Sequence, residues 1–298
     1  MEALFFALLR HWKETRPKIS ATHTPPPGFG GQSTPPPDHG VQSTPSPGYG
    51  VQSMSTNATV KRLRELHRKQ AREEQGLFLV QGYKPVRELL ASGFTVDSIH
   101  ATEAAIARMG LSHAIAHPAH DMDRMGTLES GNEVIAVARV PRPESPKPPN
   151  GNALTLALDG ISDPGNLGTL LRIADWFGAD QVWCSPDCVE VYNPKCVQAS
   201  MGSIFRVPVR YGDLPSAIMD AVGANARVYK AEASGENVFA IQLERPAVLV
   251  LGSESHGLSD AVKNGPGRSI AVPRMGSAES LNVAAAAAAL CMEFVRRA

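Results

Sequence analysis

Short apolar runs alternate with helical segments through the second half of the chain. Residues 153–158 and 247–251 are apolar at nearly every position, which is the pattern of strands buried on both faces. Residues 169–177 and 214–222 instead repeat their apolar positions with a helical period. Strands that alternate with helices in this way predict an α/β domain over residues 151–298, with a parallel sheet covered by helices.

Further elements complete this expected domain. The other strands are expected at residues 181–184, 206–209, 227–230 and 269–272, and the other helices at residues 194–204, from residue 259 and at residues 281–297. Ligands of such a parallel sheet bind at the loops beyond the carboxyl ends of its strands. Functional side chains are therefore expected in those loops.

A second, smaller α/β pattern occupies residues 54–140. Its expected strands are residues 78–80, 96–101 and 134–138, and its expected helices are residues 60–74, 85–91 and 103–109. Residues 141–150 then hold five prolines, which predict an extended and fairly stiff linker between the two domains.

Residues 24–53 repeat a ten-residue unit three times, as TPPPGFGGQS, TPPPDHGVQS and TPSPGYGVQS. A Pro- and Gly-rich unit with almost no aliphatic side chains cannot offset the entropy of ordering, so residues 1–53 are expected to be a disordered tail. We interpret the tail as dispensable or as an over-extended translation start, and a flexible tether or a docking tract for proline-binding modules is the alternative. A chain that begins at Met54 is therefore expected to keep its stability and activity.

The composition argues against several classes of protein. The 29 Lys and Arg residues balance the 29 Asp and Glu residues, so any basic partner surface must be local. Four cysteines without a secretory signal argue against a disulfide scaffold. The opening apolar run, residues 3–9, is far shorter than the roughly 18 residues of a membrane span. We therefore expect a soluble, cytoplasmic protein that does not bind membranes.

One local basic surface lies in the helix expected at residues 60–74. From Lys61 to Arg72 the chain holds six Lys or Arg residues and one Glu, a net charge of +5. This helix either contacts RNA phosphates or is an ordinary solvated face. The candidate RNA-binding residues are Lys61, Arg62, Arg64, Arg68 and Arg72.

Two loops at expected strand ends are rich in glycine and small polar residues. The first, DGISDPGNLG, contains Asn166 and leads into a helix with Arg172 on its first or second turn. The second, GSESHG, contains Gly252 and Glu254. Glycines allow tight turns and a close approach of the backbone to a ligand. Each loop alone is weak evidence, because an exposed Arg or a turn-forming acid usually has no function.

A third loop, PRMGSAESLN, opens the last expected helix. Ser280 stands at the expected N-cap, a structural position that Ser favours. Asn282 would lie in the first helical turn, where it is a poor helix former, which indicates another use.

Taken together, the motifs N-x-G-x-x-x-R, G-x-E-x-x-G and S-L-N-V, in this order, resemble the TrmH/SpoU family of RNA ribose methyltransferases in the SPOUT (α/β knot) superfamily. The segment NPKCVQASMGSIFRVPV is similar to the family's middle segment. Upstream, VKRLRELHRKQAREEQGLFLVQGYKPVRELL resembles its basic start and its small RNA-recognition domain of ribosomal-protein-like α/β fold. The resemblance covers residues 57–298 approximately.

The resemblance implies a deep trefoil knot in the C-terminal domain, a homodimer, and S-adenosylmethionine as the cofactor, with no metal. The reaction would be methylation of a ribose 2′-hydroxyl in structured RNA, ribosomal RNA more often than transfer RNA. The cofactor would contact Gly252, Val272 and Leu281.

The resemblance also implies roles for the polar residues of the three loops. Arg172 would act as the base or fix the neighbouring phosphate, and a base role would demand an unusual environment because Arg is normally protonated. Glu254 would orient Arg172. The ribose or the cofactor would be held by Asn166, Ser280 and Asn282.

Other functions fit the sequence less well. DGISDPGNLG lacks the G-x-G-x-G of a Rossmann-type methyltransferase or a nicotinamide oxidoreductase, and Glu254 replaces the serine of a hydrolase elbow. Cys184, Cys188 and Cys196 lack the paired C-x-x-C spacing of zinc sites. A non-catalytic RNA-binding protein that keeps the fold, such as a ribosome-assembly factor, is the alternative, and the intact motifs argue against it.

Overall fold

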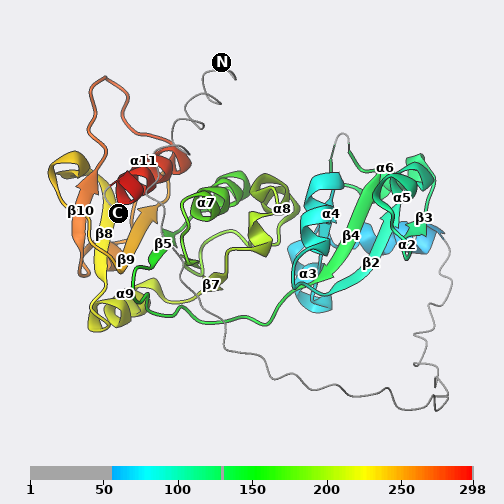
Figure 1. The fold of residues 1–298 in the computed structure, drawn as a ribbon, viewed down its shortest axis with the longest axis horizontal. Helices are drawn as coiled ribbons and strands as arrows, with labels where there is room; N and C mark the ends of the chain where they lie inside the picture. The colour runs from blue at the N-terminus through cyan, green and yellow to red at the C-terminus, as the bar shows by residue number, and fades with distance from the viewer. Residues whose placement is uncertain (1–55, 129–130, 297–298) are drawn as a thin grey trace, which may run out of the picture. The chain divides into compact units, whose positions relative to one another are not determined.

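Two β-sheets organise the part of the chain that the computed structural model describes, residues 56–128 and 131–296 (Figure 1). The expected disordered tail, residues 1–53, lies outside these residues. Within them, no helix is both long and apolar enough to cross a membrane.

The first sheet has four strands in the order β1-β4-β2-β3. They are β1 (Leu77–Gln81), β4 (Val134–Arg139), β2 (Val96–Ala101) and β3 (Ile115–Ala116). The first three pair antiparallel, and β3 pairs parallel to β2. The three longer strands match the strands expected from the sequence.

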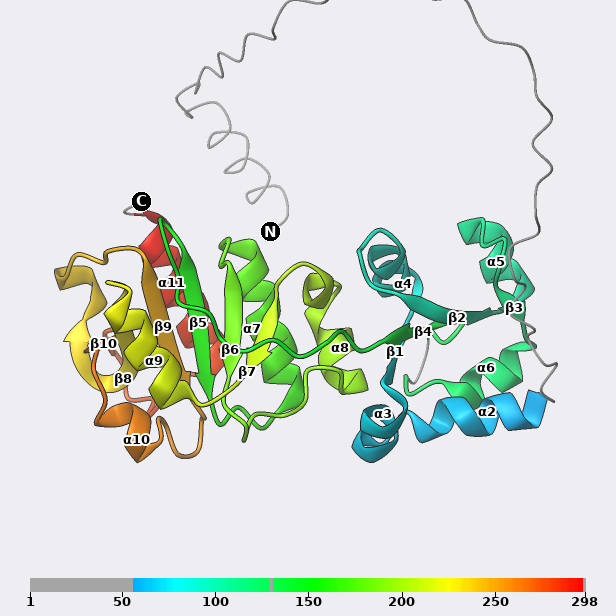
Figure 2. The same ribbon diagram turned by 90° about the horizontal axis from the view of Figure 1, so that it is seen from below.

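Helices cover both faces of this first sheet (Figure 2). They are α2 (Thr56–Glu65), α3 (Lys69–Gln75), α4 (Tyr83–Leu90), α5 (Glu103–Met109) and α6 (Ala119–Met125). Alternate residues of β1 point to opposite faces. Leu77 and Leu79 join the cluster formed with α2 and α6, whereas Phe78 and Val80 join the cluster formed with α4 and α5.

The basic helix expected at residues 60–74 is two helices in the structure. Helix α2 ends at Glu65 and α3 begins at Lys69, with a tight turn between them that is closed by i→i−3 backbone bonds such as that from His67 to Arg64. The turn lets Leu66 enter the core, where it is fully buried beside Leu63. Burial of this leucine explains the break that the charge pattern did not reveal.

The second sheet has six parallel strands in the order β10-β8-β9-β5-β6-β7, which confirms the predicted parallel sheet. They are β5 (Leu154–Asp159), β6 (Gln181–Cys184), β7 (Val209–Tyr211), β8 (Arg227–Asn237), β9 (Ala247–Gly252) and β10 (Arg268–Ala271). Strands β9 and β5 lie side by side at its centre, in register from Leu154–Ala247 to Asp159–Gly252.

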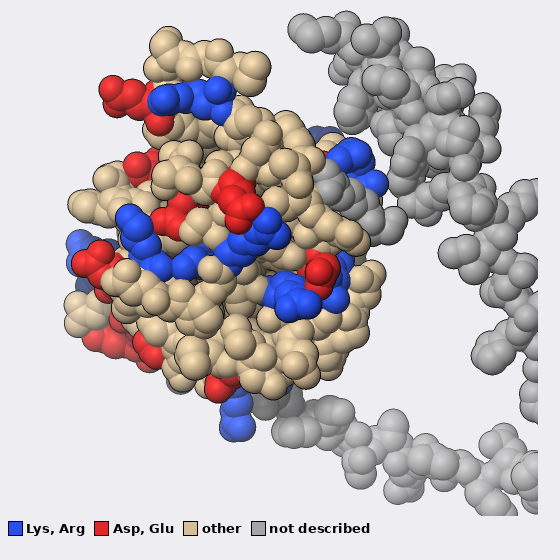
Figure 3. Space-filling model, turned by 90° about the vertical axis from the view of Figure 1, so that its left-hand side faces the viewer, with Lys and Arg blue, Asp and Glu red and all other residues tan. Residues whose placement is uncertain are grey.

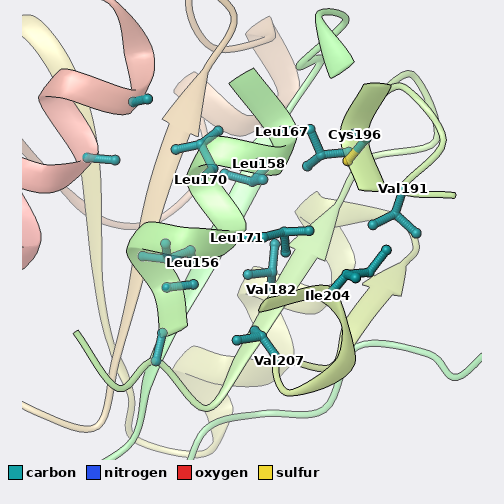
Figure 4. Close-up of a cluster of buried hydrophobic side chains, with 14 of the residues drawn as sticks. Leu156, Leu158, Leu167, Leu170, Leu171, Val182, Val191, Cys196, Ile204 and Val207 are labelled. Atoms are coloured by element: carbon teal, nitrogen blue, oxygen red, sulfur yellow. The ribbon is translucent and has the colours of Figure 1, made fainter. Parts of the chain in front are cut away.

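Two apolar layers cover this sheet. On one face pack α7 (Pro164–Trp176), α8 (Pro194–Ser200), the 3-10 turn Ser203–Phe205 and α11 (Val283–Arg296). On the other face pack α9 (Leu214–Gly223) and α10 (Asp260–Lys263). A second 3-10 turn spans Val238–Ala240. The β5 residues alternate between these layers. Leu156 and Leu158 face α7 (Figure 4), and Ala157 belongs to the cluster formed with α9.

The Pro-rich segment 141–150 has no helix or strand. It is held along the edge of the second sheet, because Gln181 donates to the Lys147 carbonyl at 2.7 Å and Arg210 pairs with Glu144 at 2.9 Å. Composition predicts an extended segment here, but it does not reveal these two attachments.

Candidate active site

Three loops meet beyond the carboxyl ends of the strands of the second sheet. We call residues 160–163, between β5 and α7, the first loop, and residues 253–259, between β9 and α10, the second loop. Residues 272–282, between β10 and α11, form the third loop. Because β5 and β9 are parallel neighbours that end in register at Asp159 and Gly252, the first and second loops start side by side.

Asn282, in the third loop, bonds to one residue at the start of α7 and to one residue of the second loop. Its amide nitrogen donates to Asn166 Oδ1 at 3.2 Å and to Glu254 Oε1. Glu254 Oε1 also accepts from the backbone N–H of Val283 at 3.3 Å. Residues that lie far apart in the sequence thus form one polar cluster.

The start of α11 differs from the expectation for Ser280 and Asn282. The helix begins at Val283, so Asn282 precedes it instead of lying in its first turn. Asn282 Oδ1 accepts from the N–H groups of Ala284 at 3.0 Å and Ala285 at 3.3 Å, which is the N-cap arrangement. Ser280 is therefore not the N-cap. It is exposed and, within the described residues, has no hydrogen-bond partner.

Asn166 lies in a helix and not in the loop where the sequence placed it. Asp163 caps α7 by accepting from Asn166 N at 2.8 Å, and Pro164 occupies the first helical turn. An acidic residue followed by proline is a readable N-cap signal, and here it marks the start of α7 ahead of Asn166. A hydrogen bond from Lys195 lowers the pKa of Asp163, so its carboxylate stays charged at the helix start.

Arg172 lies on the third turn of α7, not on its first or second, and its side chain is exposed. Within the described residues it has no hydrogen bond or ion pair, so the expected contact with Glu254 is absent from a single chain. Glu254 is engaged by Asn282 and Val283 instead. The structure therefore brings Asn166, Glu254 and Asn282 together, and leaves Arg172 and Ser280 outside their cluster.

The three residues expected to contact a cofactor lie in or next to the second and third loops. Gly252 ends β9, Val272 follows β10 and is half-buried, and Leu281 precedes Asn282 and is 53% exposed. A Cβ atom at Gly252 would lie 2.5 Å from the amide nitrogen of Leu258, so this position accepts only glycine while the second loop keeps its path.

Buried cysteines support the first loop. Cys188 Sγ accepts from the N–H of Ile161 at 3.3 Å and donates to the Leu158 carbonyl at 3.2 Å. A hydrogen bond from Cys184 lowers the pKa of Cys188 to about 7.

Among the described residues, no group of three or more His, Cys, Asp or Glu side chains is arranged to hold a metal ion.

The candidate RNA-binding residues fall into two groups. Lys61, Arg64 and Arg68 are exposed, and together with His67 and Arg124 they line a hollow of about 450 Å³ between α2 and α6. Arg62 is half-buried and pairs with Asp97 at 3.4 Å.

The prediction that Arg72, in α3, binds RNA is wrong. Arg72 is 2% exposed and pairs with Glu190 at 2.5 Å, so its guanidinium is not available to an RNA phosphate.

Basic side chains do not gather on the face of the second domain shown in Figure 3. On the face that includes the β10 edge, Lys and Arg are interspersed with Asp and Glu (Figure 3). Arg268, for example, pairs with Glu236 at 2.6 Å on the edge formed by β10 and β8. This face therefore offers no extended surface of one sign to a polyanion.

Comparison with known proteins adds independent evidence. The model of the SpoU rRNA Methylase family matches residues 153–292, and that of the MRM3-like substrate binding domain matches residues 57–139. The 23S rRNA (guanosine(2553)-2′-O)-methyltransferase RlmP of Bacillus subtilis is 30% identical over 78% of this chain and 94% of its own.

Solved structures show the same likeness. A proposed RNA methyltransferase of the TrmH family from Porphyromonas gingivalis is 34% identical, with a TM-score of 0.75 over 83% of this chain and 100% of its own. The SpoU methyltransferase AviRb from Streptomyces viridochromogenes, solved in complex with the cofactor AdoMet, is 29% identical, with a TM-score of 0.72 over 80% of this chain and 97% of its own. With its motifs, parallel sheet and loop cluster in agreement, the chain belongs to the SpoU rRNA methylase family.

Proposed function

We propose that this protein transfers a methyl group from S-adenosylmethionine to the 2′-hydroxyl of one ribose in ribosomal RNA. The observation that carries the proposal is the cluster of Asn166, Glu254 and Asn282, which joins three regions at the carboxyl ends of the parallel strands. Relatives that act on 23S rRNA, such as the Bacillus subtilis enzyme, favour ribosomal over transfer RNA.

The residues around the cluster fit a nucleoside cofactor. Adenosine sites combine apolar surface with a few backbone and side-chain polar groups. Val272 and Leu281 provide apolar surface, and the glycine at position 252 keeps the backbone of the second loop close to the strand end. The cofactor supplies a methyl group already activated by its sulfonium, so the protein has to align the hydroxyl and manage one proton.

Asn282 and Asn166 have different parts in this proposal. Every polar atom of the Asn282 side chain is already bonded within the chain, so Asn282 holds Glu254 and Asn166 in place. Asn166 uses its Oδ1 in this cluster, and within the described residues its amide nitrogen has no acceptor. We infer that this free N–H group donates to the ribose or to the cofactor.

Arg172 is proposed to bind the phosphate next to the target ribose. Its guanidinium is exposed and, among the described residues, has no partner, so it is accessible to a phosphate oxygen. An exposed Arg in water is a poor proton acceptor, so phosphate or water would accept the proton of the hydroxyl. Lys61, Arg64 and Arg68, around the hollow between α2 and α6, would contact phosphates farther along the same RNA.

The active form is proposed to be a homodimer. Helices α7 and α11 pack on each other and expose Trp176, Met292 and Val295, at 73%, 55% and 43%. Exposed apolar side chains on adjoining helices indicate a protein interface. Trp176 is one helical turn beyond Arg172, so a second copy seated here would approach Arg172.

Two further expectations belong to the same proposal. The knot implied by the resemblance would involve the second and third loops, because the chain returns from the edge strand β10 to pack α11 against α7. A cytoplasmic location is supported by four free, buried cysteines.

The test is transfer of labelled methyl from S-adenosylmethionine to total RNA that lacks the modification, followed by mapping of ribose methylation in a deletion strain. We expect one labelled 2′-O-methylated nucleotide in ribosomal RNA. Label confined to transfer RNA would contradict the choice of substrate. RNA binding without transfer would instead support a non-catalytic RNA-binding protein.

A further inference from the structure

Asp159 links the end of the central strand β5 to the far end of the second loop. Its carboxylate Oδ2 accepts a hydrogen bond of 2.7 Å from the backbone N–H of Ser259, one hundred residues later in the chain. Asp159 is 7% exposed, so water does not replace this contact readily. On the basis of the proposed function, we infer that Asp159 is a positioning residue that fixes the second loop and thereby delivers Glu254 to Asn282.

Asp159 contacts both ends of the second loop. At its start, Gly252 pairs in parallel register with Asp159 through the backbones of β9 and β5. At its end, Ser259 is bonded to the Asp159 side chain. A single residue at the centre of the sheet therefore sets the separation at which the loop leaves the sheet and returns to it.

The loop between these two ends is too tight to absorb a displacement of one of them. Ser253 and Gly257 exchange two backbone hydrogen bonds, of 3.0 and 2.9 Å, with Glu254 inside the turn that they close. The returning backbone at Leu258 is packed so closely on Gly252 that even a Cβ atom would not fit there. If Ser259 moves, Gly257 moves with it, and Glu254 leaves its hydrogen-bonding position at Asn282.

The Ser259 N–H has no other acceptor recorded within the described residues. Ser259 precedes the short helix α10, and its own side chain does not cap that helix. Ser259 is exposed, so without the Asp159 acceptor its N–H group would turn to water, and no other bond of the described residues would tie this end of the loop to β5. The expected consequence is a mobile Glu254 in a fold that is otherwise intact.

Three variants and one control test this inference. Asp159→Ala removes the acceptor, and Asp159→Asn keeps an acceptor oxygen without the charge. Ser259→Pro removes only the donor, since the φ of Ser259, −61°, already matches that of proline. The control is Asp213→Ala, because Asp213 also accepts from a backbone N–H at a helix start, that of Ser216 at 3.0 Å, but touches none of the three loops.

Amide hydrogen exchange of residues 253–259 in the protein without ligands is the first readout. We expect Asp159→Ala and Ser259→Pro to exchange at least about tenfold faster there, while Asp159→Asn and Asp213→Ala stay near the wild type. Affinity for S-adenosylmethionine, measured by calorimetry without RNA, should fall in the same two variants. Combining them should add little to either alone, because both break one bond.

Turnover separates positioning from general stability. Below the melting temperature of every variant, kcat should fall about 10- to 100-fold in Asp159→Ala with a smaller change in the KM for RNA, and Asp159→Asn should recover most of the loss. Wild-type exchange in Asp159→Ala, or equal losses in Asp159→Ala and Asp213→Ala, would overturn the inference. A wild type that binds the cofactor but methylates no RNA would contradict the proposed function and leave the exchange result standing.

Discussion

Arg72 and Glu190, 118 residues apart, form an ion pair in which the guanidinium donates to both carboxylate oxygens, at 3.1 and 2.5 Å. A third donor of Arg72 bonds to the Leu66 carbonyl at 2.8 Å. The side chain is 2% exposed, so the pair stabilises the fold at a position where the charge pattern predicted RNA binding.

Replacement of Arg72 should therefore destabilise the protein. Arg72→Met leaves the largely buried Glu190 carboxylate without its partner, and we expect the free energy of unfolding to fall by about 2–4 kcal/mol. Urea denaturation measures this loss. As a control, Lys69→Met breaks the exposed pair with Glu73 and should cost less than about 0.5 kcal/mol. Weaker RNA binding at unchanged stability would mean that Arg72 does contact RNA.

RNA affinity should depend on the exposed basic residues around the hollow between α2 and α6. Changing Lys61, Arg64 and Arg68 to Glu should weaken RNA binding more than tenfold at about 0.1 M salt and reduce the slope of log affinity against log salt by up to about three. Cofactor affinity should not change. Filter binding over a salt series measures both quantities.

A charge-matched control uses three exposed basic residues elsewhere, with Arg142, Arg227 and Lys263 changed to Glu. Equal losses in the two triple variants would show that net charge matters and that the hollow has no special part. In that case Lys61, Arg64 and Arg68 would form an ordinary solvated helix face, which is the alternative to RNA binding that the sequence allows.

The sequence predicted the strands better than the helix boundaries, and the reason is physical. Apolar runs such as β5 and β9 report burial of the sheet directly, so these two strands were placed within a residue. The edge strand β7 is less buried, and it spans Val209–Tyr211 where residues 206–209 were expected. The starts of α7 and α11 depend on capping by Asp163 and Asn282, which the apolar pattern does not report. Arg72 was misjudged because its partner, Glu190, is supplied by a distant segment that no local pattern reveals.

Capping also distinguishes Ser280 from Asn282, the two polar residues that precede α11. Asn282→Ala removes the N-cap and the bonds to Glu254 and Asn166, so it should lower stability by about 1 kcal/mol and abolish most methyl transfer. Ser280→Ala should leave stability unchanged, because Ser280 does not cap the helix. Thermal melts of the two variants measure the difference. A larger loss in Ser280→Ala than in Asn282→Ala would restore Ser280 as the cap.

The free energy of unfolding should decrease as the pH is lowered from neutral, because of His100. Burial, followed by the charge of His117, lowers the pKa of His100 from 6.5 to about 4. Because the unfolded chain protonates His100 more readily than the folded chain does, neutral His100 contributes to the free energy of unfolding. This contribution is complete above pH 6.5 and is lost as the pH falls toward 4, by about 3 kcal/mol in all. Nearby Asp97 opposes the shift, and Arg62 adds to it.

Urea denaturation at pH 7.5 and pH 5 tests this expectation. His100→Gln removes the titrating ring, so the difference in unfolding free energy between the two pH values should shrink whatever the absolute stability. His113 is exposed, and His113→Gln should keep the wild-type difference. An undiminished difference in His100→Gln would assign the acid sensitivity to other groups.

The proposed shared active site would explain why Arg172 has no partner among the described residues of one chain, and mixed dimers can test it. Arg172→Ala should bind the cofactor but not transfer methyl. Gly252→Ala should lose cofactor binding, because its Cβ would displace the second loop at Leu258. If Arg172 acts on its partner's cofactor, one site of the mixed dimer carries both defects and the other carries neither. Coexpression should then recover up to about half of the wild-type activity per mixed dimer. If Arg172 serves its own chain, each site carries one defect and no activity returns, even where the mixed dimer is shown to assemble.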